Sequence, residues 1–194
     1  MTLQEYTTAS GEVLLYSGTP NFNTLDELVK GYGDVWHSSF EQGYKNAFMD
    51  LAHQSSVLFW YINDFENLDI CVSWRINPKH FAIRKSAWEA LGGFDSDYEN
   101  IQMQALDFGY NALRTQGVVP LYVKGLFSNN TVEKVVISAR DRYVFYIKNF
   151  KIDHALFMLY RKGIWNPFEW RAFLYAKNKF RQIKNRPLFR PRQL

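Results

Sequence analysis

Residues 73–95 read SWRINPKHFAIRKSAWEALGGFD and contain the clearest order of elements in the chain. Residues 80–84 have the pattern of a strand. Ser86 and Glu89 have the spacing of a capping box, which predicts that a helix of one or two turns opens there. The pair Gly92-Gly93 ends this helix, because glycine readily adopts the positive φ found at helix C-termini. The segment therefore predicts a strand followed by a short helix.

A longer helix and another strand are predicted directly downstream. Between Glu99 or Asn100 and Gln116 the apolar residues share one helical face. Residues 118–123 then form a strand candidate, in which Pro120 favours an edge position or a bulge because proline has no N–H to give to a neighbouring strand.

Upstream of this segment the pattern also alternates between strands and helices. A strand is predicted from Glu12 to Tyr16, and Thr24 can cap a helix that follows it. A second helix is expected over residues 40–53, and the β-branched and aromatic run at 56–62 suits a buried strand. The fold class up to about residue 125 is therefore mixed α/β.

The C-terminal part is helical and aromatic. Ser138 can cap a helix from Ala139 to Lys162, and Asn166-Pro167 has the character of a cap and first turn for another helix that runs to about Asn185. We expect these helices to form a hairpin. The chain then divides into an α/β domain over 1–135 and a helical hairpin with a basic tail over 136–194.

Eight large aromatic rings in this hairpin are more than one narrow core face can hold, so some should lie against another domain, a subunit or a membrane. The alternative interpretation is that most of them pack in the core. They are Phe145, Phe150, Phe157, Phe168, Trp170, Phe173, Tyr175 and Phe180.

Charge and composition restrict the class of protein. The chain of 194 residues has net charge +4, yet residues 177–194 hold seven Lys or Arg and no acid. Such a tail predicts an anionic partner, such as lipid headgroups, or else a solvated terminus. The absence of a nucleic-acid motif argues against nucleic acid. The chain has no apolar run of about 18–20 residues that could span a membrane. It also has no signal peptide and a single cysteine, Cys71, so we expect a cytoplasmic protein that is peripheral at the inner membrane face.

Several motifs together resemble glycosyltransferase family 2, which has the GT-A fold. In that family a strand ending in Arg is followed by a short helix, by Gly-Gly-Phe-Asp, by an acid-bearing helix and by a strand after Gly. The matching parts here are Arg84, residues 92–95, Asp107 and Gly117. The resemblance covers residues 73–125, with a weaker match at Asp34-Val35-Trp36-His37-Ser38, and implies a partial GT-A-like sheet that corresponds to the acceptor-side half.

The resemblance also implies a function in bacterial capsule or exopolysaccharide biosynthesis. A sugar would pass from a nucleotide sugar to a lipid-linked glycan acceptor. The family's donor half, with an Asp-x-Asp motif that holds a divalent metal, has no counterpart here. A divalent ion, Mn or Mg, is expected only if a donor site exists, and a separately encoded subunit is one source of the donor half. The alternative is a non-catalytic module that binds a glycan or scaffolds a partner enzyme.

Residues 92–95 are the candidate sugar contact. Gly92 and Gly93 allow a ligand to approach the backbone, and Asp95 can accept hydrogen bonds from sugar hydroxyls. The alternative is a simple helix cap, in which Phe94 supplies the accompanying hydrophobic contact and Asp95 forms a turn.

The candidate base is a carboxylate near the following helix, because inverting transfer needs a proton acceptor for the acceptor hydroxyl. The family's base position holds Gln104-Ala105 here, so Asp107 or Asp97, with Glu99 as a further option, would take the role. For Asp107 the alternative is an exposed helical acid.

Trp74, Arg75 and Arg84 complete the candidate binding residues. The planar guanidinium matches phosphate oxygens, although both arginines could equally be structural ion-pair partners. Two pairs of acids, Asp95-Ser96-Asp97 and Asp64-Phe65-Glu66, could hold a cation, but acids in loops are more often solvated. The four histidines do not have the spacing of metal ligands, so the sequence assigns no metal ligand.

Overall fold

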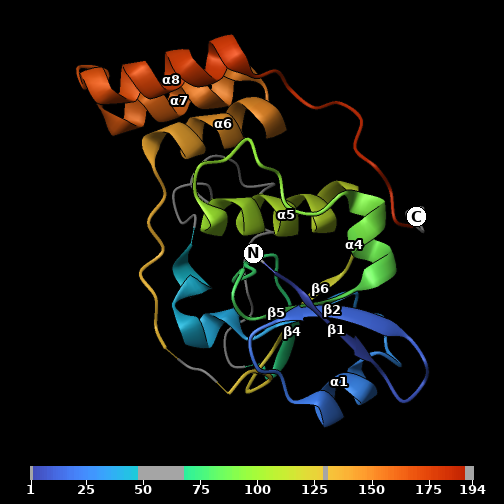
Figure 1. The fold of residues 1–194 in the computed structure, drawn as a ribbon. Helices are drawn as coiled ribbons and strands as arrows, with labels where there is room; N and C mark the ends of the chain where they lie inside the picture. Colours follow the sequence, from blue (N-terminus) through green and yellow to red (C-terminus); the bar gives the residue numbers. More distant parts are fainter. Residues whose placement is uncertain (1, 48–67, 129–130, 191–194) are drawn as a thin grey trace.

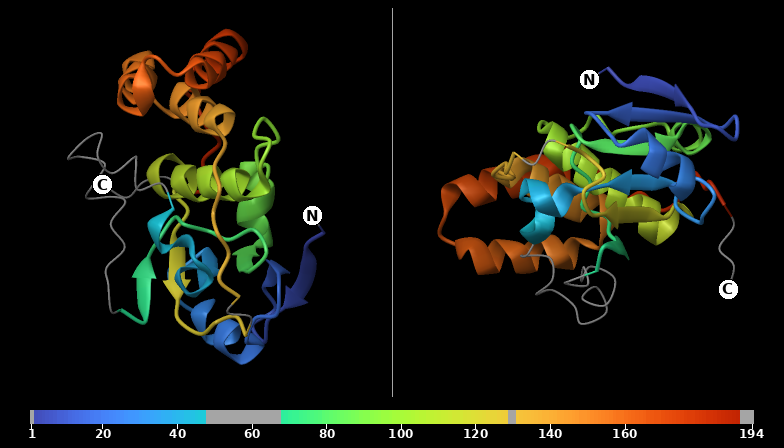
Figure 2. Two further views of the ribbon diagram at one scale, coloured as in Figure 1. Left: turned by 90° about the vertical axis from the view of Figure 1, so that its left-hand side faces the viewer. Right: turned by 90° about the horizontal axis from the view of Figure 1, so that it is seen from below.

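The computed structural model describes residues 2–47, 68–128 and 131–190. In this part of the chain a mixed sheet forms one layer, α5 crosses above it, and three helices form a further layer beyond α5 (Figures 1 and 2). The strands are β1 (Gln4–Thr7), β2 (Val13–Ser17), β3 (Val35–His37), β4 (Ile70–Val72), β5 (Phe81–Arg84) and β6 (Pro120–Val123). The α-helices are α1 (Phe22–Leu28), α4 (Lys85–Leu91), α5 (Ile101–Thr115), α6 (Ala139–Asn149), α7 (Ile152–Gly163) and α8 (Pro167–Lys179). The mixed α/β class is confirmed.

The sheet has the strand order β1-β2-β5-β3-β6-β4. Only β3 and β6 pair in parallel, and the other neighbours are antiparallel. β5 lies inside the sheet, where Ile83 pairs with Leu15 on one side and Val35 on the other. All four β5 residues are buried, including Arg84, which forms ion pairs inside the fold.

The predicted strand-to-helix order at β5 and α4 is confirmed, but the predicted capping box is wrong. Arg84 is the N-cap residue and its side chain makes no capping hydrogen bond. Ser86 lies inside α4, because the last residue of β5 leads directly into the helix. Gly92 ends α4 with φ of 78°, as the sequence predicted.

Two further local predictions are corrected. Asn21 caps α1 by accepting a hydrogen bond from the Thr24 N–H, so Thr24 is not the cap. Pro120 lies on an interior strand, since β6 pairs with both β3 and β4. It is tolerated because it is the first residue of the strand, where the missing N–H removes the least pairing.

The predicted helix over 40–53 is also wrong where the structure describes it. Residues 39–46 form two 3-10 turns, η1 (Ser39–Gln42) and η2 (Tyr44–Asn46), separated by Gly43 with φ of 91°. The rest of that helix, the predicted strand at 56–62 and the acidic pair Asp64 and Glu66 lie outside the described residues.

The C-terminal layer contains three helices and not the predicted hairpin of two. The backbone is extended at Phe150, which divides the expected long helix into α6 and α7. Ser138 and Asn166 cap α6 and α8 as predicted, with side chains that accept from Asp141 N–H and Phe168 N–H. No helix in the described residues is both long and apolar enough to cross a membrane.

Residues 180–190, here termed the C-terminal strap, return from α8 along the body of the molecule toward α4 (Figure 1). The Phe189 N–H donates to the Gln116 carbonyl at 2.8 Å, and the Phe189 ring packs on the core beneath α4. Arg190 donates to Oδ1 of buried Asp34 at 2.6 Å. The end of the predicted basic tail is therefore attached to the α/β layer.

Gly109 allows α5 to cross residues 73–77 closely. A Cβ at Gly109 would overlap the Trp74 carbonyl oxygen and lie 3.0 Å from Cδ1 of Ile76. We expect Gly109→Ala to lower the free energy of unfolding by about 1–3 kcal/mol, although alanine has the higher helix propensity. Urea unfolding of both proteins measures the difference, and an unchanged or raised free energy would contradict the close crossing.

Candidate functional site

A cavity of about 260 Å³ lies between the connection from α4 to α5, α5 itself and the C-terminal strap. Five residues singled out in the sequence meet at this cavity, although residues 96–106, which include the first part of α5, separate the fifth from the other four. They are Gly92, Gly93, Phe94, Asp95 and Asp107. The other lining residues are Leu91, Phe108, Asn111, Gln116, Ile183, Asn185, Arg186 and Pro187.

Asp107 is buried at this cavity and is not the exposed helical acid of the alternative interpretation. Its Oδ1 accepts hydrogen bonds from the Tyr98 hydroxyl and from Asn149 Nδ2, each at 2.7 Å. No hydrogen bond from the described residues reaches Oδ2. Arg186 is held nearby, because its guanidinium donates to Asn149 Oδ1 at 2.9 Å.

The environment of Asp107 makes its carboxylate a better proton acceptor than an ordinary aspartate. Burial raises the pKa of Asp107, while the Arg186 charge and the hydrogen bonds from Tyr98 and Asn149 oppose that rise. A carboxyl with a raised pKa binds a proton more tightly, which is the property that a general base requires.

Asp95 and Asp97 share one internal cation. The buried Lys148 ammonium pairs with Asp95 and lies 2.7 Å from Oδ2 of Asp97. Asp95 also accepts the Asp97 N–H at 3.0 Å, which forms a tight turn. Asp95 lines the cavity and Asp97 does not. In the described part of the chain no three Asp, Glu, His or Cys side chains form a group suited to a metal ion.

Gly92 and Gly93 cap α4 and also line the cavity. The Gly92 N–H donates to the carbonyls of Trp88 and Glu89, which caps α4. Both glycines have positive φ, of 78° and 74°. A Cβ at Gly93 would lie 2.9 Å from the Trp88 ring, whereas a Cβ at Gly92 would point into open space. The same pair therefore ends the helix, and no described side chain beyond its chain neighbours lies within 4 Å of the position that a Cβ would take at Gly92.

Phe94 has a packing role in addition to its place at the cavity. Its ring contacts those of Phe81, Trp88 and Phe108, with centroid distances of 5.6, 5.0 and 5.5 Å. These rings anchor the Gly-Gly-Phe-Asp segment to β5, α4 and α5, so the cavity wall has a fixed position.

Arg84 lies away from the cavity and is an ion-pair partner inside the fold. It pairs with Glu12 and with buried Asp34, whose Oδ1 is 3.2 Å from Nε. It also donates to the carbonyls of Gly33 at 3.0 Å and Val29 at 2.8 Å. Its guanidinium therefore joins β5 to the segment after α1.

Arg75 and Trp74 are likewise absent from the cavity lining. Arg75 donates from Nε to the Ala47 carbonyl at 3.0 Å, its guanidinium lies 5.2 Å from the Trp74 ring centroid, and burial lowers its pKa to about 10. Trp74 is buried and meets Tyr110 edge to face.

The sequence reasoning missed the polar residues that complete the cavity, namely Asn111, Gln116, Asn185 and Arg186. Asn111 lies one turn after Asp107, and its side chain donates to the Asp107 carbonyl at 2.9 Å, so helical spacing was an available signal. For Asn185 and Arg186 no such signal exists, because a basic terminal run does not show where it folds back.

A separate buried group makes stability depend on pH. His37 donates from Nε2 to the Ser73 carbonyl at 2.9 Å, and its Nδ1 accepts the Ser39 N–H at 3.3 Å, which suits the neutral ring. Burial lowers the pKa of His37 from 6.5 to about 4. The native state therefore binds fewer protons than the unfolded chain between these values.

We expect the His37 contribution to be fully present above pH 6.5 and to be lost as pH falls toward 4. Between pH 7 and pH 5 the free energy of unfolding should therefore fall by about 2 kcal/mol because of His37. Urea unfolding of wild type and His37→Gln at both pH values measures it. Carboxyl groups with a raised pKa change the stability of wild type and variant equally, so the difference between the two proteins reports His37. Equal changes in wild type and variant would contradict the assignment.

Comparison of the chain with models of known protein families, with curated proteins and with solved structures found no match.

Proposed function

We propose that this chain is a glycosyltransferase-like protein of bacterial surface-polysaccharide biosynthesis that binds one sugar unit in the cavity beside Gly92 and Asp107. The observation that carries the proposal is that the Gly-Gly-Phe-Asp segment and the Asp107 carboxylate line the same cavity. Both belong to the set of motifs that carry the family resemblance.

The chemistry of the cavity suits a sugar ring. Phe94 and Phe108 offer apolar ring surface, while Asp95, Asn111 and Arg186 offer hydrogen-bonding groups of both kinds. At about 260 Å³ the cavity is smaller than the pockets of about 300–1,000 Å³ that hold drug-sized ligands. This size favours one sugar unit of an acceptor over a whole nucleotide sugar.

In an active complex Asp107 would be the proton acceptor. The acceptor hydroxyl oxygen would bond to the anomeric carbon of the donor sugar, the nucleoside diphosphate would leave, and the hydroxyl proton would pass to the Asp107 carboxylate. The donor and any divalent metal would be held by a partner subunit. Asp97 is less suited to this role, because it pairs with Lys148 and does not line the cavity.

The second candidate is a glycan-binding module that performs no transfer. The missing counterpart of the family's donor half favours it, and Lys148 already serves as the cationic partner of Asp95 and Asp97. Transfer assays with the donor subunit added separate the two candidates, and Asp107→Asn should abolish transfer only if the first is right.

Thermal unfolding with a panel of nucleotide sugars and oligosaccharides, each with and without Mn²⁺, tests binding. A ligand present at 100 times its dissociation constant stabilises the fold by about 2.7 kcal/mol. We expect oligosaccharides to stabilise the protein more than nucleotide sugars do. If no sugar raised the unfolding temperature, the proposal would fail for both candidates.

Asp107→Asn should weaken sugar binding about tenfold or more, because the amide cannot accept hydrogen bonds with a charged oxygen. Since the pKa of Asp107 is raised, ionisation costs the native state stability as pH rises, and the amide removes that cost. The variant should therefore remain folded above neutral pH. Glu89→Gln is the matched control, because Glu89 is exposed on α4. Equal loss of binding in both variants would contradict the role of Asp107.

A further inference from the structure

Helices α7 and α8 expose large apolar side chains on the outer surface of the molecule. Trp165, in the turn between the helices, is 90% exposed, and Phe168 and Tyr160 are each 71% exposed. Single exposed apolar residues are common, but a group of this size on adjacent helices indicates a surface that contacts something apolar.

These side chains occur at helical spacing and so share faces. Ile152, Leu156 and Tyr160 are four residues apart on α7, and Trp170 and Leu174 are four apart on α8. Trp170 Nε1 donates to the Ile164 carbonyl at 2.5 Å, which ties α8 to the turn. We term this surface the outer face; it comprises Ile152, Leu156, Phe157, Tyr160, Ile164, Trp165, Phe168, Trp170 and Leu174.

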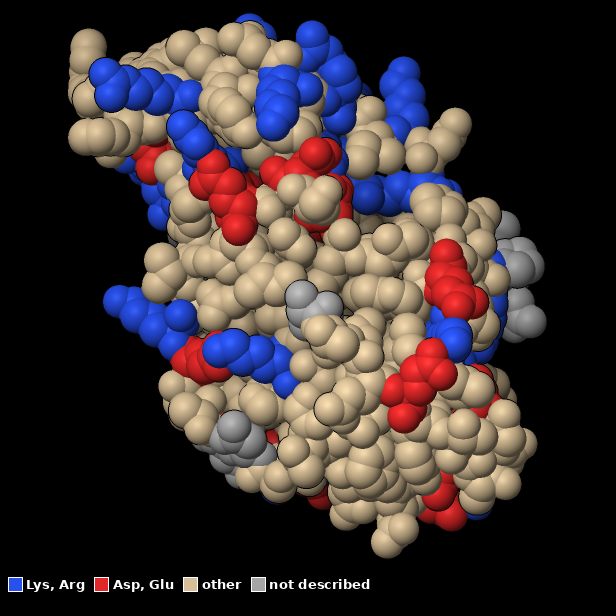
Figure 3. All heavy atoms as spheres, in the orientation of Figure 1, with Lys and Arg blue, Asp and Glu red and all other residues tan. Residues whose placement is uncertain are grey.

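Exposed basic side chains surround the outer face. They are Lys151, Arg161, Lys162, Arg171, Lys177, Lys179 and Arg181. Figure 3 shows Lys and Arg gathered over this layer, with tan surface between them. Asp153 is the exposed acid of these helices, whereas Glu169 is buried and pairs with Arg142 at 2.7 Å. The surface therefore combines aromatic groups with net positive charge.

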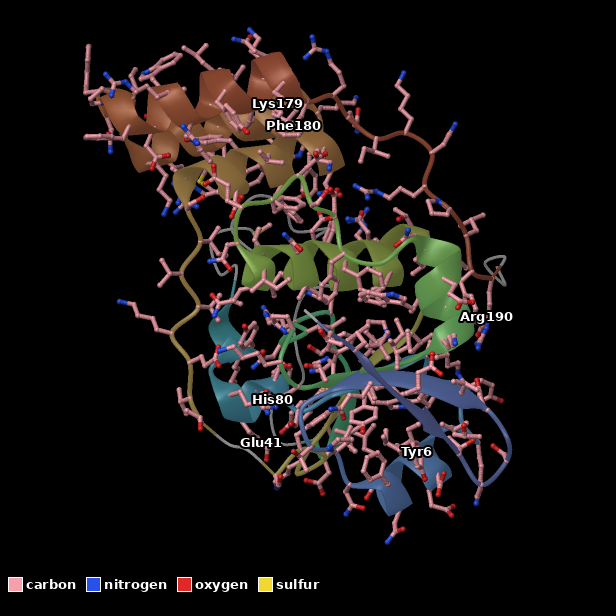
Figure 4. The ribbon with its side chains drawn as sticks, viewed as in Figure 1. Tyr6, Glu41, His80, Lys179, Phe180 and Arg190 are labelled. Atoms are coloured by element: carbon pink, nitrogen blue, oxygen red, sulfur yellow. The ribbon has the colours of Figure 1, made fainter. Side chains whose placement is uncertain are left out.

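A second cavity, of about 340 Å³, opens beside one end of the outer face. Ile147, Phe150, Ile152 and Phe180 give it an apolar lining, and Lys151, Lys177 and Arg181 add positive charge. Among the described residues that line it, none is acidic. At the end of α8, Lys179 lies beside Phe180, with its ammonium 5.3 Å from the ring centroid (Figure 4).

We propose that the outer face docks on an anionic lipid bilayer and that the second cavity receives a lipid phosphate. Aromatic rings with basic neighbours are suited to the headgroup region, where the rings enter the apolar boundary and the cations meet anionic lipids. Ile152 belongs to both the outer face and the cavity, so one membrane contact can use both. The positive rim distinguishes this surface from a purely apolar subunit contact.

This surface differs from the contact that the basic tail predicted. Within 177–194, Arg186 is bound to Asn149 and Arg190 to Asp34, so these charges serve the fold. Lys177, Lys179 and Arg181 remain exposed at the helical layer. The membrane contact therefore centres on residues 151–181.

Vesicle sedimentation with the full chain tests the outer face. We expect binding to phosphatidylcholine vesicles that contain phosphatidylglycerol, weaker binding to pure phosphatidylcholine, and release by salt. The double variant Trp165→Ser/Phe168→Ser should lower the affinity for these vesicles by about tenfold or more. Tyr32→Ser is the matched control, because Tyr32 is 90% exposed in the loop after α1, at the opposite end of the molecule (Figure 1).

The charged part of the proposal has its own variant. Each Lys or Arg near an anionic surface contributes about fivefold in affinity. Lys177→Gln/Arg181→Gln should therefore weaken vesicle binding markedly, whereas Lys30→Gln/Lys124→Gln, remote from α7 and α8, should not. Competition by inorganic phosphate would show that the cavity takes free phosphate as well as lipid.

Three results would overturn the proposal. They are absence of vesicle binding, equal binding to neutral and anionic vesicles, and a dimer in solution that Trp165→Ser/Phe168→Ser dissociates. The last would assign the outer face to a second copy of the chain. Light scattering of wild type and the double variant would detect such a dimer.

Discussion

Arg84→Met should lower the free energy of unfolding by about 3–5 kcal/mol, the range expected when one partner of a buried ion pair is removed. Asp34 has no exposed surface, and Arg84 pairs with it and with Glu12. The carbonyls of Val29 and Gly33 also lose their donor. Methionine fills much of the volume of the Arg84 side chain, so the fall in the free energy of unfolding reports the lost polar contacts.

Arg140→Met is the matched control for Arg84. Arg140 pairs with Glu99 at 2.8 Å, but both side chains are more than half exposed, so its loss should cost about 1 kcal/mol or less. Urea unfolding of the three proteins measures the difference. If the two variants unfolded alike, Arg84 would not be a structural residue, and its candidate role as a phosphate ligand would be open again.

Phe189→Ala/Arg190→Gln should release the end of the C-terminal strap and lower the free energy of unfolding by about 2–4 kcal/mol. The Phe189 ring leaves the core beneath α4, and buried Asp34 loses the hydrogen bond from Arg190. Figure 4 shows Arg190 at the end of the strap beside α4. A freed strap would also displace Asn185 and Arg186 from the cavity, so sugar affinity should fall.

Hydrogen exchange checks the release of the strap directly. The N–H groups of Ile183 and Phe189 donate to the carbonyls of Lys148 and Gln116, so both should be protected in wild type and should exchange faster in the variant. Leu188→Ala is the control on the same segment, because Leu188 is exposed. Unchanged exchange at Ile183 would mean that the strap is held independently of its end.

Local signals allowed the order of β5, α4 and α5 to be predicted, because the glycine that ends a helix and the apolar spacing along a helix lie within the element or next to it. The capping box predicted for α4 was wrong, since Arg84 and not Ser86 precedes the helix. The strands β1, β3 and β4 were missed. β3 and β4 have three residues each, and what makes them strands is pairing with distant segments, as when Val35 pairs with Ile83 and Pro120.

The candidate site was predictable in part for the same reason. Residues 92–95 and Asp107 could be singled out because their motifs are local. The burial of Asp107 depends on Asn149 and Tyr98, and the cavity wall depends on the strap, which no sequence spacing reveals. Arg75 and Arg84 were candidate ligands because an arginine that binds phosphate and one that pairs inside the fold look alike in a sequence.

The most direct test of the sugar cavity is a map of amide chemical shifts as the best-stabilising oligosaccharide is added. We predict that the largest changes fall on Gly92, Gly93 and Asp95, and on the side-chain amides of Asn111 and Asn185. In Asp107→Asn these changes should need an oligosaccharide concentration about tenfold or more higher, and in Glu89→Gln they should occur at the wild-type concentration. Changes that fall elsewhere, or that occur in Asp107→Asn at the same oligosaccharide concentration as in wild type, would contradict the account.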